Sequence, residues 1–571
     1  MFNQTTDPIA GSLVLSALCA ALPLLLLFVL IGFFRVKAPK AVFASLTLSI
    51  VLAVVGWKMP VGQALSATAE GLAFGLFPIL WILVNALWVY RLTVATPWFE
   101  VLGQTIRSIS KDHRILAILI AFGFGALLEA LAGFGAPVAI AAAMLIAAGM
   151  KPLKSAIVAL VANTAPVAFG AMGAPIIALA GVTGLKVDTL SAMAGRQGII
   201  ALVVPMLLVY IVDGRRGLRQ TWPVALVAGV VFSLTQYAVS NYGAVQLTDV
   251  VAAVVTVAVV MGMLRVWQPA ELISSAQVDA EAEAKESQES HLVWAGRPAG
   301  SVVGSNARYC ATGSQKPVED DSRPSGGRIL MAVAPYMIII AVFSIAQIPS
   351  VKTWLTSIGS VTFHWPGLDI VTEAGKPVSA QTFKFEHIKA TGTLLLFSGL
   401  ATMALYKISA SKGWRVYKEG VYALRWTIVT VSLMLALSYV MNLSGQTTTM
   451  GVALAATGSL FAVLSPVIGW IGTALTGSDT SSNSLFGGLQ VTAANQTGLS
   501  PVLMAVSNSS AGALGKMVSL QNLAVAAAAA TLEGGESILF RKLLGWSIGL
   551  LVLLAALVWL QSTPILGWMV P

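Results

Sequence analysis

Long apolar runs without a single charge limit what this chain can fold into. Two of them, 11–34 and 543–571, contain no Asp, Glu, Lys or Arg. A hydrocarbon core about 30 Å thick needs about 20 apolar residues per helix, and about a dozen segments approach that length. Since a helix satisfies its own backbone hydrogen bonds in lipid, the runs predict an all-α polytopic membrane protein with about 12 transmembrane helices.

The composition supports a lipid-embedded chain. Of its 571 residues, 57% are hydrophobic and only 10% are charged, whereas soluble domains carry about 25% charged residues. The formal net charge is +10, but the basic residues lie in short clusters between apolar runs, which is typical of cytoplasmic loops. The lipid bilayer is therefore an expected partner and nucleic acid is not.

The placement of basic residues predicts the orientation. Residues 1–8 contain no Lys or Arg, whereas basic residues follow the first run at 35–40 and crowd the segment 213–219. A pair at 541–542 precedes the last run. Because Lys and Arg concentrate in cytoplasmic loops, we expect 213–219 to form a cytoplasmic loop and both the N-terminus and the C-terminus to lie outside.

A change in composition divides the chain near its middle. Residues 268–327 are rich in Ala, Glu, Ser, Gln and Gly, carry both charge signs and lack a sustained apolar period. This composition is typical of disordered segments. We therefore expect a first transmembrane half at 1–267, a disordered cytoplasmic linker at 268–327 and a second transmembrane half at 328–571.

Each half contains a similar polar interruption of its apolar pattern. The sequence Leu-Ala-Gly-Phe-Gly at 131–135 precedes Asn163, Gly170 and Met172, and Leu-Thr-Gly-Ser-Asp at 475–479 precedes an Asn, Gly and Met at the same spacing, 508, 515 and 517. Such Gly-interrupted segments at corresponding places are the best sequence indication of a transporter's midplane site. The pattern predicts two inverted-repeat halves with broken helices.

Close helix packing offers a simpler explanation for these small residues. It accounts well for scattered Gly and Ser, but poorly for the eight consecutive polar or Gly residues at 476–483. Broken helices expose free N–H groups that favour an anion. We therefore predict that substrate is bound by Gly133, Gly135, Asn163, Thr164, Ser478, Thr480, Ser481, Ser482, Asn483, Asn508, Ser509 and Lys516.

Three charged residues lie deep in these apolar regions, namely Glu129, Asp479 and Lys516. Charges at such depth are expensive and are usually functional. An apolar site disfavours an ionised carboxyl, which suits a proton carrier, so Glu129 and Asp479 are the proton-coupling candidates. A structural ion pair between Lys516 and one of the acids is the alternative, and both readings stay open.

Enzymatic and ATP-driven functions find no support in the sequence. There is no Walker loop, and no nucleophile–base pair is visible. None of the four histidines has metal-ligand spacing, and Cys19 and Cys310 are far apart. We therefore expect no cofactor, no metal site and no catalytic residues.

The chain resembles the bacterial L-lactate permease family in the segments 128–140, 163–173 and 476–483, and in the shorter matches 213–217 and 515–517. This resemblance implies proton-coupled uptake of L-lactate, with D-lactate or glycolate as further substrates, across the bacterial inner membrane. It also implies kinship with ion-coupled transporters that have re-entrant hairpins and often move as elevators.

Two other functions stay open on the residues alone. Hydroxyl groups and the carbonyls of broken helices could coordinate sodium, which would make the chain a sodium-coupled carrier of another organic anion. A passive channel would also span the membrane many times, but would not accumulate substrate.

Overall fold

The computed structural model describes residues 1–34, 36–107, 110, 112–131, 133, 135–269, 271, 325–373, 375, 377–378, 381–532 and 535–571. Ten helical segments in these ranges are long and apolar enough to cross a membrane, or eleven when one bent pair counts as a span. This confirms an all-α polytopic membrane protein. Most of the expected linker, 272–324, lies outside the described residues, together with Cys310.

The expected figure of about 12 spans stays a prediction, because several helical segments do not correspond to one membrane span each. One of the ten, 187–242, contains a kink at Gly214, where φ is +62°. The expected loop at 213–219 is thus helical except for this kink. Two other apolar helices, Ala136–Ala147 and Thr391–Leu405, are shorter than a full span.

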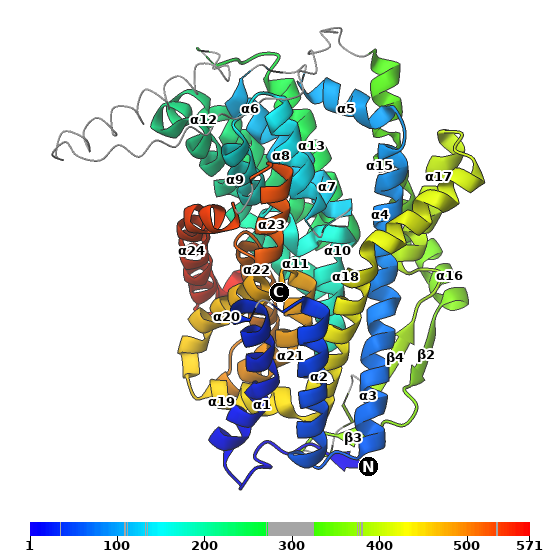
Figure 1. Cartoon of the computed structure of the whole chain (residues 1–571), viewed down its shortest axis with the longest axis vertical. Coiled ribbons are helices and arrows are strands. Elements are labelled where there is room, and N and C mark those ends of the chain that lie inside the picture. The colour runs from blue at the N-terminus through cyan, green and yellow to red at the C-terminus, as the bar shows by residue number, and fades with distance from the viewer. Residues whose placement is uncertain are drawn as a thin grey trace, which may run out of the picture.

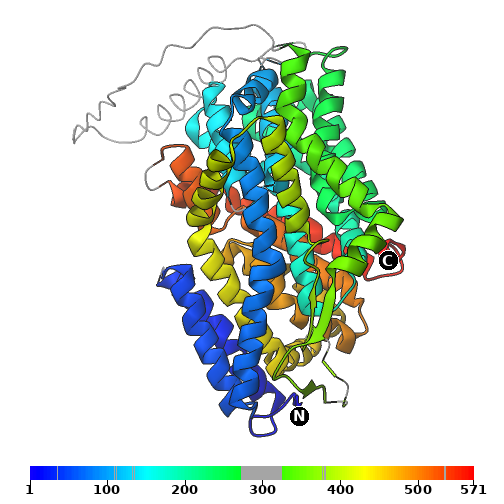
Figure 2. The same ribbon diagram turned by 90° about the vertical axis from the view of Figure 1, so that its right-hand side faces the viewer.

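Long helices from both halves of the chain pack side by side. Helix α18 (Ala410–Ser444) lies against α2 (Ala38–Val55), α3 (Val61–Phe74) and α4 (Trp81–Val94), and α17 (Thr391–Leu405) packs on α4. Figures 1 and 2 show α3 and α4 as one long rod beside α18. The first and second halves are therefore interleaved in space.

Other helices pack around this rod or around the hairpins described below. They are α1 (Leu13–Phe28), α5 (Trp98–Arg107), α11 (Val187–Gln197), α12 (Val203–Tyr242), α13 (Thr248–Met263), α15 (Gly326–Gln347), α16 (Pro349–Gly359), α19 (Gln446–Ala455) and α24 (Glu536–Gln561). Shorter helical turns join several of them, at η1 (Val29–Phe33), η2 (Gly75–Leu80), η5 (Gly198–Leu202), η6 (Val245–Leu247), η8 (Gly458–Leu460) and η9 (Gly567–Met569).

Four short strands lie at the end of the molecule that carries the N-terminus (Figure 1). Strand β1 (Phe2–Asn3) pairs in parallel with β3 (Ile370–Val371). Strand β2 (Val361–His364) pairs antiparallel with β4 (Thr382–Phe385). The chain start and the segment after α16 therefore share one end of the protein.

Each half contains a helical hairpin followed by a broken helix. In the first half, α6 (His113–Leu116), η3 (Ala117–Phe124) and α7 (Gly125–Leu131) lead into α8 (Ala136–Ala147). Next, α9 (Pro152–Ala162) and α10 (Gly170–Thr183) are separated by the short turn η4 (Val167–Phe169), with a bend of 64°. In the second half, the same order is α20 (Phe461–Thr476), α21 (Asp479–Thr497), α22 (Pro501–Lys516) and α23 (Leu520–Ala529).

The breaks follow from local backbone chemistry. Gly477 ends α20 with φ of +76°, and its N–H donates to the Thr473 carbonyl, as expected for a left-handed C-cap. Ser478 then caps α21 by accepting a hydrogen bond from the Ser481 N–H, which satisfies a free helix donor. At the other break, Ala171 and Met172 adopt positive φ of 44° and 57°, a strained conformation that clusters at functional sites.

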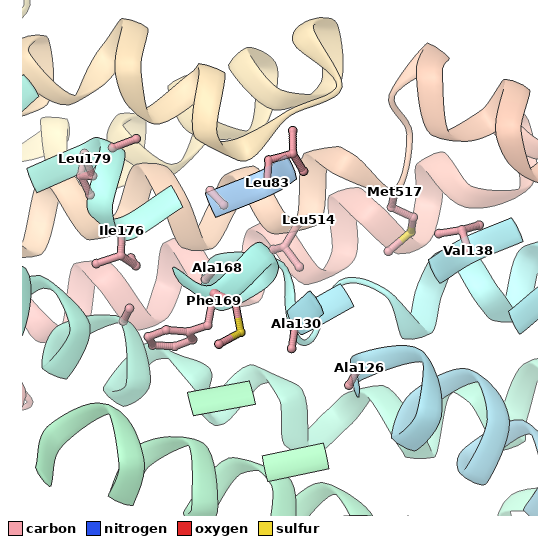
Figure 3. Close-up of a cluster of buried hydrophobic side chains, with 14 of the residues drawn as sticks. Leu83, Ala126, Ala130, Val138, Ala168, Phe169, Ile176, Leu179, Leu514 and Met517 are labelled. Carbon is pink, nitrogen blue, oxygen red and sulfur yellow. The ribbon is translucent and has the colours of Figure 1, made fainter. Parts of the chain in front are cut away.

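The two halves interlock at these breaks. Helix α8 packs against α23, and α10 packs against α21. Hydrophobic side chains from both halves meet around the turn η4 in one cluster, with Val138 and Phe169 from the first half and Leu514 and Met517 from the second (Figure 3). The hairpin of each half therefore packs against the broken helix of the other half. That the halves are related as inverted repeats stays a prediction.

A buried arginine ties the start of α6 to α12. The guanidinium of Arg114 is fully buried and bonds the Asp112 carboxylate at 2.7 Å and the Asp213 carboxylate at 3.1 Å. It also donates to Gln220 Oε1 at 2.6 Å and to the Glu271 carbonyl at 2.8 Å. One side chain therefore joins α6, the kinked region of α12 and the chain after α13.

Replacing Arg114 should destabilise the fold strongly. Arg114→Ala removes the cation that Asp112 and Asp213 share, although Arg216 still pairs with Asp213, and breaking such a buried pair costs about 3–5 kcal/mol. Arg114→Lys rescues little because an ammonium cannot reproduce the forked geometry. Thermal unfolding in detergent would measure the loss. The exposed neighbour Arg215 provides the control, since Arg215→Ala should stay within about 0.5 kcal/mol of the wild type. Unfolding of Arg114→Ala at the wild-type temperature would contradict this role.

Candidate functional site

The two breaks meet around a small pocket. Its walls come from both halves of the chain, which explains why no single sequence segment contains it. The lining residues are Glu129, Gly133, Val167, Gly170, Ala171, Pro175, Gly477, Ser478, Asp479, Thr480 and Lys516.

An ion pair joins the halves at this pocket. The Lys516 ammonium, at the end of α22, lies 2.5 Å from Glu129 Oε1 on α7. Both side chains are almost fully buried, and Asn163 Nδ2 donates to Glu129 Oε2 at 2.8 Å. The carboxylate also packs closely on the backbone, because a Cβ at Gly170 would lie 2.9 Å from Oε1. Glu129 is therefore held from three sides.

Asp479 forms a separate hydrogen-bonded centre at the first residue of α21. Its Oδ2 accepts from the Ser509 hydroxyl at 2.7 Å and from Asn483 Nδ2 at 3.4 Å. Its Oδ1 is buried and has no hydrogen-bond partner among the described residues. Unlike Glu129, this carboxyl has neutral donors and no ion pair in the described part of the chain.

A second layer of amides and hydroxyls supports Asp479 from behind. Asn483 Nδ2 also contacts the Ser509 hydroxyl at 2.9 Å and the Pro175 carbonyl at 3.2 Å. Asn508 donates to Asn483 Oδ1 at 3.0 Å, and Gln490 donates to Asn508 Oδ1 at 3.2 Å. Such connected networks fix side-chain orientations in an apolar surrounding.

The predicted site residues thus fall into two groups. Six line the pocket, namely Glu129, Gly133, Ser478, Asp479, Thr480 and Lys516. The others lie behind or beside it and are not among its lining residues: Gly135, Asn163, Thr164, Ser481, Ser482, Asn483, Asn508 and Ser509.

The residues of the second group have identifiable contacts of their own. Gly135 faces α23, where a Cβ would lie 3.2 Å from Asn522 Oδ1. The Ser482 hydroxyl donates to the Gly469 carbonyl at 3.3 Å within the hairpin. The Thr164 hydroxyl donates to the Val161 carbonyl at 2.7 Å, and the residue faces a different cavity.

That second cavity, of about 420 Å³, lies on the other side of the broken helix. Residues 164–165 and 168–169 line it, whereas 167 and 170–171 line the first pocket. The η4 turn is therefore a thin partition between two cavities. The polar side chains of the second cavity are Thr164, Gln197, Gln236 and Ser510.

Two buried carboxyl groups were not among the site residues predicted from the sequence. Asp249, on α13, is 1% exposed and accepts one hydrogen bond, from Gln236 Nε2 at 2.9 Å. Glu70, on α3, is 1% exposed, and neither of its oxygens has a hydrogen-bond partner within the described ranges. The rule that singled out Glu129, a lone acid in an apolar segment, applies equally to both residues.

Comparisons with known proteins find relatives that match nearly the whole chain. The sequence profile of the L-lactate permease family matches residues 16–565. The chain is 38% identical to an L-lactate permease of Bacillus subtilis (strain 168), over 100% of both chains. It is 38% identical to the glycolate permease GlcA of Escherichia coli (strain K12), over 96% of this chain and 97% of the relative.

A third relative, an L-lactate permease of Escherichia coli (strain K12), is 36% identical over 100% of both chains. The relatives are permeases, which confirms the expectation of a membrane transporter and not an enzyme. With a profile match over nearly its whole length and relatives that align from end to end, the chain belongs to the L-lactate permease family.

Proposed function

We propose that the chain is a secondary active transporter that takes up L-lactate by proton symport across the bacterial inner membrane, with D-lactate and glycolate as further substrates. The observation that carries the proposal is a buried ammonium, that of Lys516, in the wall of a pocket between two helix breaks. A small carboxylate is the natural partner of such a group. The substrates named for the relatives, L-lactate and glycolate, support the same class.

The substrate carboxylate would bind the Lys516 ammonium and the free N–H groups at the start of α21, where a helix terminus favours an anion. The hydroxyls of Ser478 and Thr480 are the nearest partners for the 2-hydroxyl group, since both residues line the pocket. Gly133 leaves the opposite wall without a side chain. The remaining candidates act by holding these groups in place: Gly135, Asn163, Thr164, Ser481, Ser482, Asn483, Asn508 and Ser509.

Glu129 or Asp479 would carry the coupling proton. A substrate anion that takes Lys516 away from Glu129 leaves that carboxylate without its cation, so proton binding there would compensate the buried charge. Asp479 has neutral partners only, and its Oδ1 is unpaired in the described structure. Either group links anion binding to proton binding through charge.

The predicted topology completes this proposal. Both termini would lie outside the cell, and the two halves, 1–267 and 328–571, would be joined on the cytoplasmic side by the linker 268–327. The hairpins and broken helices would then move together against the rod of α3, α4 and α18, as in an elevator.

A sodium-coupled organic-anion carrier is the second candidate, and one observation favours it. Asp479 Oδ1 and Thr473 Oγ1 are both buried, and the Thr473 hydroxyl interacts with this carboxyl. Both oxygens also crowd the same spot on Gly512, where a Cβ would collide with them. A carboxylate oxygen and a hydroxyl oxygen at one place form a partial set of cation ligands.

Proteoliposomes with independent pH and sodium gradients separate these two functions. An inside-alkaline gradient should drive L-lactate accumulation, since each entering proton carries one substrate anion with it, and a protonophore should abolish it. D-lactate and glycolate should compete with labelled L-lactate, whereas a dicarboxylate should not.

Empty liposomes provide the control for this uptake assay. Accumulation driven by sodium at constant pH would replace proton symport with the second candidate. Uptake that equilibrates and never exceeds the outside concentration would indicate a channel.

Variants of the Lys516–Glu129 pair should distinguish its effect on the stability of the fold from its effect on substrate binding. Lys516→Met leaves Glu129 buried without a cation and should cost about 3–5 kcal/mol of unfolding free energy, whereas Lys516→Met with Glu129→Gln should restore much of it. Both variants should bind L-lactate about tenfold or more weakly, because a hydrogen bond to a charged group is worth about 1.5–3 kcal/mol. Thermal unfolding and ligand binding in detergent would give the two readouts.

The exposed Lys542 supplies the matched control, since Lys542→Met should change neither readout. Native affinity for L-lactate in the double variant would remove Lys516 from the substrate site.

The proton-carrying carboxyl can be found by comparing Glu129→Gln with Asp479→Asn. The variant that loses the carrier should exchange labelled for unlabelled L-lactate but fail to accumulate it, because exchange needs no net proton movement. The exposed Glu419 gives the control Glu419→Gln, which should accumulate normally. Full accumulation in Glu129→Gln would exclude Glu129 from the proton path, and the same outcome in Asp479→Asn would exclude Asp479.

A further inference from the structure

Asp249 is a buried carboxyl without a counter-ion. It is the second residue of α13 and is 1% exposed. Its Oδ1 accepts from Gln236 Nε2 at 2.9 Å, whereas Oδ2 has no hydrogen-bond partner in the described ranges. An ionised carboxylate in such a place is an uncompensated buried charge, which proteins avoid by pairing or neutralising the group.

The elements packed against α13 offer Asp249 no cation. Helix α12 presents the uncharged Gln236, and α7 presents Glu129, a like charge within electrostatic reach. The sequences of η3, η6, α10 and the rest of α13 contain no titratable side chain. On α15, Tyr336 is buried and Arg328 is exposed. The arginines of α12 lie within 213–219, about 25 Å along that helix from Gln236. No neighbouring cation therefore competes with a proton for Asp249, and proton binding there depends on the charge of the groups around it.

Gln236 connects this carboxyl to the second cavity and to the broken helix. Its Nε2 donates to Asp249 and lies 3.5 Å from the Ala165 carbonyl in the break. Its Oε1 is buried, is unpartnered in the described structure and packs directly on Gly198, where a Cβ would collide with it. Since Gln236 and Ala165 both line the second cavity, one side chain separates Asp249 from that space.

The same break also reaches the substrate pocket. Asn163 binds Glu129, which pairs with Lys516 in the wall of the first pocket. Two residues further along, Ala165 contacts Gln236. The segment 163–165 therefore contacts Glu129 directly and reaches Asp249 through Gln236.

We propose that Asp249 is a proton-binding site of the transport cycle, loaded and emptied through the second cavity behind the broken helix. This inference rests on the proposed proton symport and names a further residue that takes part in it. Arrival of a substrate anion at Lys516 adds negative charge near Glu129 and Asp249, so it strengthens proton binding at Asp249. Release of the anion weakens proton binding at Asp249, so the anion and the proton cross the membrane in the same direction.

The test uses the full-length protein in proteoliposomes. A gradient of about one pH unit can sustain about a tenfold accumulation at one proton per lactate. Asp249→Asn mimics the protonated carboxyl, so pH-driven accumulation should fall to about onefold, while exchange of labelled for unlabelled L-lactate stays within about twofold of the wild type. Exchange by the wild type should decline at alkaline pH, and exchange by the variant should depend less on pH.

Asp188→Asn is the matched control, because Asp188 is also the second residue of its helix, α11, but is exposed. It should accumulate as the wild type does. Wild-type accumulation in Asp249→Asn would overturn the inference, and so would loss of L-lactate binding in a variant that still elutes as a folded protein.

Two further outcomes are also decisive. If Asp249→Asn does not fold, Asp249→Glu keeps a titratable carboxyl at a displaced position and should shift the pH profile of accumulation, whereas an unchanged profile would contradict the proposal. If the wild type itself does not respond to a pH gradient, proton symport fails as the function, which is distinct from failure of Asp249 alone.

Discussion

Lys516 and Glu129 come from opposite halves of the chain and meet where neither could be buried alone. Removing one member of such a pair costs about 3–5 kcal/mol, whereas replacing both with well-packed apolar groups is often neutral. The pair is therefore a poor source of net stability. Its value lies in position, since it joins the end of α22 to α7 in the wall of the pocket. A substrate anion can then enter by exchange with Glu129, without exposing a new charge.

The broken helix between α9 and α10 organises the space around this pair. Its η4 turn separates two cavities, and the strained residues Ala171 and Met172 stand beside the turn. A continuous helix would present only side chains to both spaces, but a break lets one short segment contact Glu129 through Asn163 and Gln236 through Ala165. Events on one side of the partition can thus act on the other over a few residues.

Much of this arrangement could be predicted from the sequence, and the rest depended on contacts between distant segments. Apolar runs indicated the helices, and the repeated Gly–Asn–Gly–Met pattern located both breaks. The pairing of Lys516 with Glu129 and not with Asp479 could not be read from spacing, since both acids are suitable partners. The hydroxyls at 481–482 looked like binding groups, yet a helix turns successive side chains to different faces. Of the hydroxyl-bearing residues in 476–483, Ser478 and Thr480 line the pocket and the others do not. Asp249 and Glu70 were missed because they lie outside the repeated motifs.

The distribution of charge explains why anion and proton would travel together. With the pocket empty, Lys516 neutralises Glu129, so the charge nearest to Asp249 is balanced. A bound substrate carboxylate would pair with the Lys516 ammonium, so the site would then contain one cation and two or more acidic groups. In an apolar interior this excess negative charge is unfavourable unless protons compensate it. Under the proposed symport, a carrier built this way would move most easily when the anion and the proton are both bound or both absent.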